Sequence, residues 1–66
     1  MVKLKEFREI KQLTQQQAAE SIGIDQRQWS RYEQGKNEIP VRYIIEICRT
    51  HSVSADWILG LTERRR

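Results

Sequence analysis

The sequence has one cysteine, one histidine and one proline, and it contains no long run of apolar residues. A lone cysteine excludes an intramolecular disulfide, and Cys48 with His51 cannot supply the four ligands of a structural zinc site. No apolar stretch approaches the roughly 18 residues of a membrane span, and the amino terminus lacks a signal-peptide core. These absences predict a cytoplasmic protein that is held together by hydrophobic packing, with no metal, no cofactor and no membrane partner.

With 66 residues, the chain has room for one domain. A chain of this size buries only about 60% of its unfolded surface, which disfavours a large catalytic cleft and therefore an enzyme. Hydrophobic residues make up 38% of the chain and charged residues 32%, which is typical of a folded globule rather than a disordered tail. We expect a domain over residues 1–62, followed by a basic, frayed tail at residues 63–66.

The net charge is +3, and the excess lies at the two ends of the chain. Residues 1–11 and 62–66 each carry a net charge of +2, whereas the residues between them are slightly acidic. Basic ends are compatible with a solvated fringe and with a surface that binds phosphate groups. Charge by itself does not distinguish the two.

The spacing of apolar residues predicts five short helices and no strand. Leu4, Phe7 and Ile10 lie at helical spacing in the first helix, over residues 3–11. Thr14 with Gln17 forms a capping box that starts a second helix, which we expect to end at a glycine.

The remaining helices are delimited by further capping and breaking residues. Asp25 is an N-cap for a third helix that ends near Gly35, and Pro40 favours the start of a fourth. Ser54 caps a short fifth helix, which Gly60 ends. The apolar stripe of the fourth helix is predicted to comprise Val41, Ile44, Ile47, Cys48 and His51, widened by Ile45.

Residues 14–35 meet the requirements of a helix-turn-helix, in which two helices cross steeply at a turn too short to form a loop. Ala19 is the small residue at the crossing, and Gly23 supplies the turn. The core shared by the two helices is predicted to comprise Ile22, Ile24, Trp29 and Tyr32.

The third helix is predicted to expose a polar, cationic face opposite Trp29 and Tyr32. In isolation this face is compatible with ordinary solvated residues, but next to a helix-turn-helix it favours reading of DNA in the major groove. Arginine binds guanine bidentately and glutamine binds adenine in the same way, so the side-chain types suit base recognition. The candidate base-reading residues are Gln26, Arg27, Gln28 and Arg31. The candidate contacts to the DNA backbone are Gln15, Gln16, Ser30, Gln34, Lys36 and Asn37.

Six segments of the sequence together resemble the phage repressor and Cro type of helix-turn-helix domain, also called the xenobiotic-response-element type. They are Leu4-Lys5-Glu6-Phe7-Arg8, Leu13-Thr14-Gln15, Ala19, Gly23, Trp29-Ser30-Arg31-Tyr32-Glu33-Gln34-Gly35-Lys36 and Val53-Ser54-Ala55-Asp56-Trp57-Ile58-Leu59-Gly60. The resemblance covers residues 3–62. It implies a lambda-repressor-like, all-α domain of five helices that binds an operator in double-stranded DNA, usually as a homodimer on a palindrome.

Carried over residue by residue, the resemblance assigns phosphate binding to Gln15 and base reading to Gln26, Arg27 and Arg31. It also assigns a backbone contact to Lys36. The sequence departs from the family in having Asp25 where Ser or Thr is the more familiar cap, which places a negative charge near an approaching phosphate. Because the recognition positions vary within the family, the operator sequence does not follow from the resemblance.

Other residues have structural interpretations. Glu33 is expected on the inward flank of the third helix, where an unpaired carboxylate is costly, and we predict that it pairs with Arg8. A catalytic role for Glu33 is disfavoured because no second acid, base or nucleophile is spaced to act with it. Trp57 and Leu59 are expected in the core. Residual exposed apolar surface, and with it a dimer contact, is assigned to Ile45, Ile58 and Leu61.

We therefore expect a bacterial or phage-encoded transcriptional regulator, a repressor that occludes a promoter. The alternative is an antitoxin-like or adaptor module that uses the same scaffold to hold a protein partner. The chain has no room for a separate ligand-sensing domain. Regulation then comes from concentration, proteolysis, a protein partner or a larger parent protein.

Overall fold

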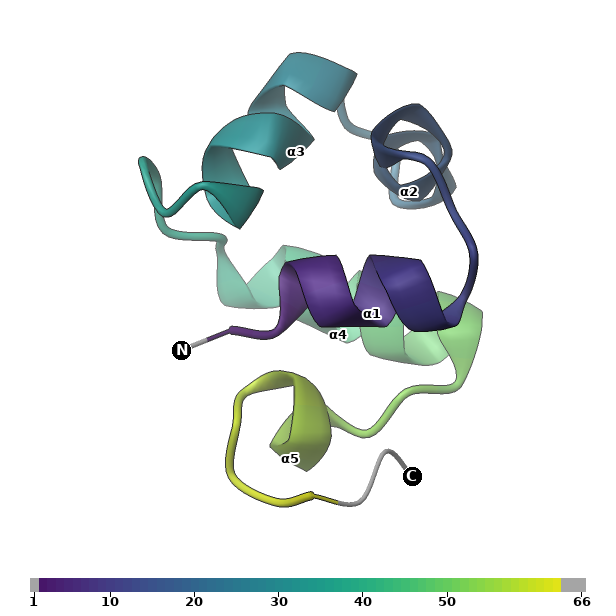
Figure 1. Cartoon of the computed structure of the whole chain (residues 1–66), viewed down its shortest axis with the longest axis vertical. Coiled ribbons are helices and arrows are strands. Elements are labelled where there is room, and N and C mark those ends of the chain that lie inside the picture. The colour runs from purple at the N-terminus through teal and green to yellow at the C-terminus, as the bar shows by residue number, and fades with distance from the viewer. Residues whose placement is uncertain (1, 64–66) are drawn as a thin grey trace.

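The computed structural model describes residues 2–63, and these residues form five α-helices and no strand. The helices are α1 (Leu4–Ile10), α2 (Gln15–Ser21), α3 (Gln26–Glu33), α4 (Val41–His51) and α5 (Ala55–Ile58). In Figure 1, α2 and α3 lie together on one side of the molecule, α5 lies on the opposite side, and α1 and α4 lie between them. The predicted all-α fold with five helices is thus confirmed.

Side-chain caps set the starts of three helices. The Thr14 hydroxyl accepts a hydrogen bond from the Gln17 amide at 3.0 Å, and the Gln17 side chain accepts one from the Thr14 amide at 2.9 Å, which completes a capping box. The Asp25 carboxylate accepts from the Arg27 amide at 2.6 Å, and the Ser54 hydroxyl accepts from the Trp57 amide at 3.3 Å. The helix starts are therefore fixed by interactions within three residues of each cap.

The turn between α2 and α3 depends on Gly23, whose φ angle of +77° is a left-handed conformation that other residues adopt only at a steric cost. The Ile24 amide donates to the Ala19 carbonyl at 3.0 Å and so returns the chain toward α2 immediately after the glycine. Because the turn is short and hydrogen-bonded to α2, the direction of α3 is set by α2.

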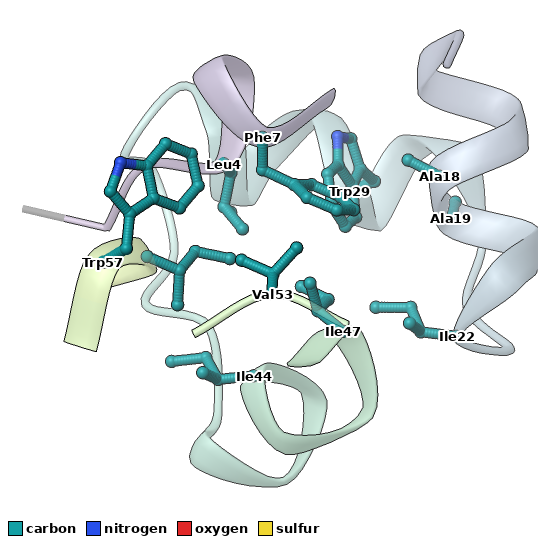
Figure 2. Packing of buried hydrophobic residues seen from close by; sticks show 11 residues of the cluster. Leu4, Phe7, Ala18, Ala19, Ile22, Trp29, Ile44, Ile47, Val53 and Trp57 are labelled. Atoms are coloured by element: carbon teal, nitrogen blue, oxygen red, sulfur yellow. The ribbon is translucent and has the colours of Figure 1, made fainter. Parts of the chain in front are cut away.

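One hydrophobic core joins all five helices. Trp29 is fully buried and its ring packs 6.2 Å from that of Phe7. Ala18 and Ala19 of α2 are also fully buried, and Figure 2 shows the Ala18 methyl group directed toward Trp29. Small side chains at this point let α2 approach α3 closely. The other buried hydrophobic residues are Leu4, Ile22, Ile44, Ile47, Val53, Trp57 and Ile58.

Two sequence predictions at the carboxyl-terminal helix are wrong. Ile58 has no exposed surface, so it cannot contribute to an exposed dimer contact, and Leu59 is 37% exposed rather than part of the core. Ile58 belongs to the hydrophobic cluster that joins the helices, and the other end of the chain also contacts this helix. The Lys3 amide donates to the Ile58 carbonyl at 2.7 Å, and the Lys3 ammonium lies 5.5 Å from the centre of the Trp57 ring. The segment that precedes α1 thus contacts α5, and the sequence of α5 does not reveal this contact.

The apolar stripe of α4 is narrower than its spacing predicts. Ile44 and Ile47 are buried, but Val41 is 69% exposed and Ile45 is 49% exposed. Ile45 therefore remains available as surface, as does Leu61, which is 73% exposed. Of the predicted basic tail, residues 64–66 lie outside the described part of the chain.

Candidate nucleic-acid interface

The packing of α3 against α2 determines which face of α3 reaches solvent. Trp29 anchors the inward side, the opposite side carries Arg27 and Arg31, and Gln26 lies in the first turn of the helix; all three polar residues are exposed. The guanidinium groups of Arg27 and Arg31 lie one turn apart and give this face a positive charge. A helix of this kind fits the major groove, where arginine and glutamine side chains reach base edges.

The amino-terminal ends of α2 and α3 meet at an open recess on this surface. The residues that line the recess are Gln15, Asp25, Gln26, Arg27 and Ser30. The structure thus brings together two predicted base-reading residues and two predicted backbone contacts, from both helices of the helix-turn-helix. The Asp25 carboxylate, which caps α3, is also in the recess and adds a negative charge there. This is the charge that the departure from the family pattern predicts.

Gln15 lines the recess and also forms a hydrogen bond with the end of α3. Its Nε2 donates to Glu33 Oε1 at 3.3 Å, which ties the start of α2 to the end of α3. Gln16 lies apart from the recess residues and instead donates to Glu20 one turn later on α2, at 3.2 Å. The two glutamines, adjacent in sequence, therefore occupy different settings.

At the other end of α3, the loop that follows the helix holds Arg31. With the Asn37 amide turned to the orientation that satisfies both of its ends, its oxygen accepts from Arg31 Nε at 3.2 Å and its nitrogen donates to the Lys36 carbonyl at 2.8 Å. The Lys36 amide also donates to the Arg31 carbonyl at 3.0 Å. Arg31, Lys36 and Asn37 are all exposed, so the loop and the helix form one continuous polar surface. Asn37 orients a base-reading candidate in addition to any contact of its own.

The two flanks of the exposed face carry one hydrogen-bonded pair each. On one flank, Gln34 Nε2 donates to Ser30 Oγ at 2.9 Å. On the other, Gln28 Nε2 donates to the Tyr32 hydroxyl at 2.8 Å, and Gln28 is half-buried. Gln28 therefore differs from Gln26 and Arg27, which are exposed.

The ion pair expected between Arg8 and Glu33 is present behind the interface. Arg8 Nε lies 2.7 Å from Glu33 Oε2, Arg8 Nη1 donates to the Leu13 carbonyl at 3.1 Å, and Trp29 Nε1 also donates to Glu33 Oε2. Burial alone raises the pKa of Glu33, but hydrogen bonds from Arg8, Trp29 and Gln15 outweigh it, so the pKa lies below its ordinary value. The carboxylate therefore stays charged and joins three helices.

Sequence reasoning missed Arg42 and Tyr43 in the first turn of α4. The Arg42 guanidinium lies 4.8 Å from the centre of the Tyr43 ring, and that ring packs 6.3 Å from Tyr32 of α3. An exposed arginine two residues after a helix-starting proline was the available signal. Only tertiary packing brings Arg42 and Tyr43 close to α3.

Neither a membrane span nor a metal site is found within residues 2–63. None of the helices there is both long and apolar enough to cross a membrane. In the same residues, no three His, Cys, Asp or Glu side chains are grouped so as to hold a metal ion.

The two crossed helices, their glycine turn and the exposed cationic face of α3 define a helix-turn-helix DNA-binding domain. A family model described as "Helix-turn-helix" matches residues 4–58, and the chain belongs to this family. It is 36% identical over 61 residues to the uncharacterized HTH-type transcriptional regulator YobD of Bacillus subtilis (strain 168). The match covers 92% of this chain and 54% of that protein, so the chain spans about half the length of this relative. No solved structure is significantly similar to the chain.

Proposed function

We propose that the protein is a transcriptional regulator that binds double-stranded DNA with sequence specificity, through α3 in the major groove. The observation that carries the proposal is the fixed orientation of α3, whose buried Trp29 leaves Arg27 and Arg31 exposed on the opposite face. The similarity to a bacterial protein named as a transcriptional regulator supports it. In this proposal the protein is bacterial or phage-encoded and acts on DNA in the cytoplasm.

The individual roles follow from position on the surface. Gln26, Arg27 and Arg31 read bases, because they lie on the exposed face of α3. Gln15 and Lys36 contact phosphates, because they lie at the start of α2 and in the loop after α3, to either side of the reading face. Further backbone contacts are assigned to Gln16, Ser30, Gln34 and Asn37.

The regulatory mode is proposed to be repression by occupancy of an operator. Two copies that place their α3 helices about 34 Å apart read two half-sites of a palindrome one DNA turn apart. The dimer contact is assigned to Ile45 and Leu61, whose exposed fractions are 49% and 73%. Burial of these side chains against a second copy removes apolar surface from water.

Selection of bound sequences from a random duplex pool, at two salt concentrations, tests the proposal. We expect a palindrome with half-sites about ten base pairs apart and a steep fall in affinity with salt, because each phosphate contact releases counterions. Recovery of no motif, or of weak binding that modest salt abolishes, contradicts the proposal.

The exposed apolar residues of α4 favour a second candidate function. Val41 and Ile45 are 69% and 49% exposed, and such residues suit contact with a different protein as well as with a second copy. An antitoxin-like or adaptor module would use this surface to hold its partner. Sedimentation of the purified protein separates the two, since the operator-binding proposal requires a homodimer without any added partner.

A further inference from the structure

Gln28 is the one base-reading candidate on α3 whose side chain is tied to a tyrosine. Its Nε2 donates to the Tyr32 hydroxyl at 2.8 Å, and the side chain lies half-buried on the flank of α3 that faces α4. Gln26, Arg27 and Arg31 are exposed on the same helix. The setting of Gln28 therefore depends on a tyrosine of its own helix, whereas Arg31 is contacted by Asn37 of the following loop.

Tyr32 is itself held in place by α4. Its ring packs 6.3 Å from the ring of Tyr43, and Arg42 lies over Tyr43 with Nη2 donating to the Tyr43 hydroxyl at 3.4 Å. Hydrogen bonding from Arg42, with a smaller contribution from Gln28, lowers the pKa of Tyr43 below its ordinary value. The Gln28 amide thus lies against two tyrosine hydroxyls, and both tyrosines are supported from α4.

The consequence for recognition follows from the chemistry of the amide. A glutamine side chain offers two N–H donors and a carbonyl acceptor, and a free glutamine rotates to present either kind of group. In Gln28 one N–H donates to the Tyr32 hydroxyl and the amide also hydrogen-bonds to Tyr43, so both donors are directed at the tyrosines and Oε1 is the atom left to meet DNA. In the major groove an acceptor pairs with the exocyclic amino group of adenine or cytosine, and not with guanine or thymine.

We propose that Tyr32 is a positioning residue that fixes the amide of Gln28 so that Gln28 accepts a hydrogen bond from adenine or cytosine. This inference rests on the proposed function, because it assumes that α3 occupies the major groove. It adds a specificity determinant that does not itself touch DNA.

The test compares base preference at every operator position for the wild-type protein, Tyr32→Phe, Gln28→Ala and the double variant. Phenylalanine keeps the ring that packs on Tyr43 and removes only the hydroxyl. We expect Tyr32→Phe to lower the preference for adenine or cytosine at one position by about three- to ten-fold, the worth of one hydrogen bond. Gln28→Ala abolishes preference at the same position, and adding Tyr32→Phe to it changes nothing further.

Two further readouts separate positioning from a general structural effect. The salt dependence of binding and the thermal midpoint of Tyr32→Phe should equal those of the wild type, because no phosphate contact and no packing is removed. Thr50→Val is the control, since it removes an exposed hydroxyl of α4 that has no assigned DNA contact. It should leave preference at the Gln28 position unchanged.

Each contrary result has a distinct meaning. Full preference in Tyr32→Phe, with loss in Gln28→Ala, overturns the inference because Gln28 then reads without Tyr32. Unchanged preference in both variants also overturns it, because Gln28 then reads no base. A wild-type protein with no base preference at any position contradicts the proposed function itself.

Discussion

The two faces of α3 differ in where their polar groups find partners. On the inward face, Trp29 is fully buried, Glu33 has only 7% of its side chain exposed, and Glu33 receives hydrogen bonds from α1, α2 and α3. On the outward face, Arg27 and Arg31 are exposed, as is Gln26 in the first turn. Among residues 2–63, no buried side-chain nitrogen or oxygen lacks a partner. The inward polar groups are thus completed within the protein, and hydrogen-bonding capacity for another molecule lies on the outward face.

This difference predicts that stability and DNA binding respond to separate substitutions. A residue on the inward face should affect unfolding first, because its removal leaves buried groups without partners. A residue on the outward face should affect binding and leave unfolding nearly unchanged. Four variants and one control substitution test the separation.

Arg8→Met has the largest expected effect. It leaves the Glu33 carboxylate buried without its cation, so the free energy of unfolding should fall by about 3 kcal/mol at neutral pH in urea titrations. Because the folded-state pKa of Glu33 lies below its ordinary value of 4.5, the ion pair stabilises above that pH and is lost as the pH falls through the folded value. The gap between wild type and variant should therefore narrow in acid.

The control for this variant is Arg49→Met. Arg49 is 75% exposed and lies 3.6 Å from Glu46 on the surface of α4. Its loss should change the free energy of unfolding by less than about 0.5 kcal/mol. Equal destabilisation by both variants would show that the Glu33 network does not hold the helices together.

Arg31→Ala tests the outward face. It removes one candidate base contact, so discrimination between the selected operator and a variant at a single base pair should fall by about 1–3 kcal/mol. Fluorescence anisotropy with the two duplexes measures this, and urea unfolding should match the wild type. A loss of stability comparable to that of Arg8→Met would break the distinction between the two faces.

Lys36→Ala should have a smaller effect, and one of a different kind. A phosphate contact carries no sequence information, so affinity should weaken equally for operator and random duplexes. The slope of log affinity against log salt should fall by about one unit, as measured by titration at several salt concentrations. If Lys36→Ala altered base preference instead, Lys36 would belong with the base-reading residues.

The smallest expected effect is a pH dependence on the inward side. Ser21 Oγ donates to the Ala18 carbonyl at 2.7 Å, so it accepts from His51 Nε2, 2.9 Å away, while the Phe7 ring packs 4.9 Å from the imidazole. Burial first, and then Lys11, lower the pKa of His51 below 6.5. The unfolded chain therefore binds the proton more readily. The contribution of neutral His51 to the free energy of unfolding should be fully present above pH 6.5 and should decline as the pH falls below it.

Chemical unfolding from pH 5 to 7.5 checks this expectation. His51→Gln keeps a donor for Ser21 and does not titrate, so it should lack the decline between pH 6.5 and 5. The same slope in both proteins would assign the decline to other groups.

Much of the interface could be predicted from the sequence, because it follows from local geometry. The periodicity of α3 places Arg27 and Arg31 opposite Trp29 whatever lies beneath the helix. The settings of Gln28 and Gln16 could not be predicted in this way. Helical periodicity assigns a direction to each side chain, but it does not show that Gln28 donates to Tyr32 or that Gln16 donates to Glu20.

The sequence by itself determined the five helices, their caps and the glycine turn, because a capping hydrogen bond or a left-handed residue acts within a few positions. The tertiary structure decided what involves residues far apart in the chain. The segment around Lys3 bonds to α5, α1 and α2 add donors that keep Glu33 ionised, and α4 supports Tyr32. Contacts between distant segments depend on how whole helices pack, and no local pattern records them.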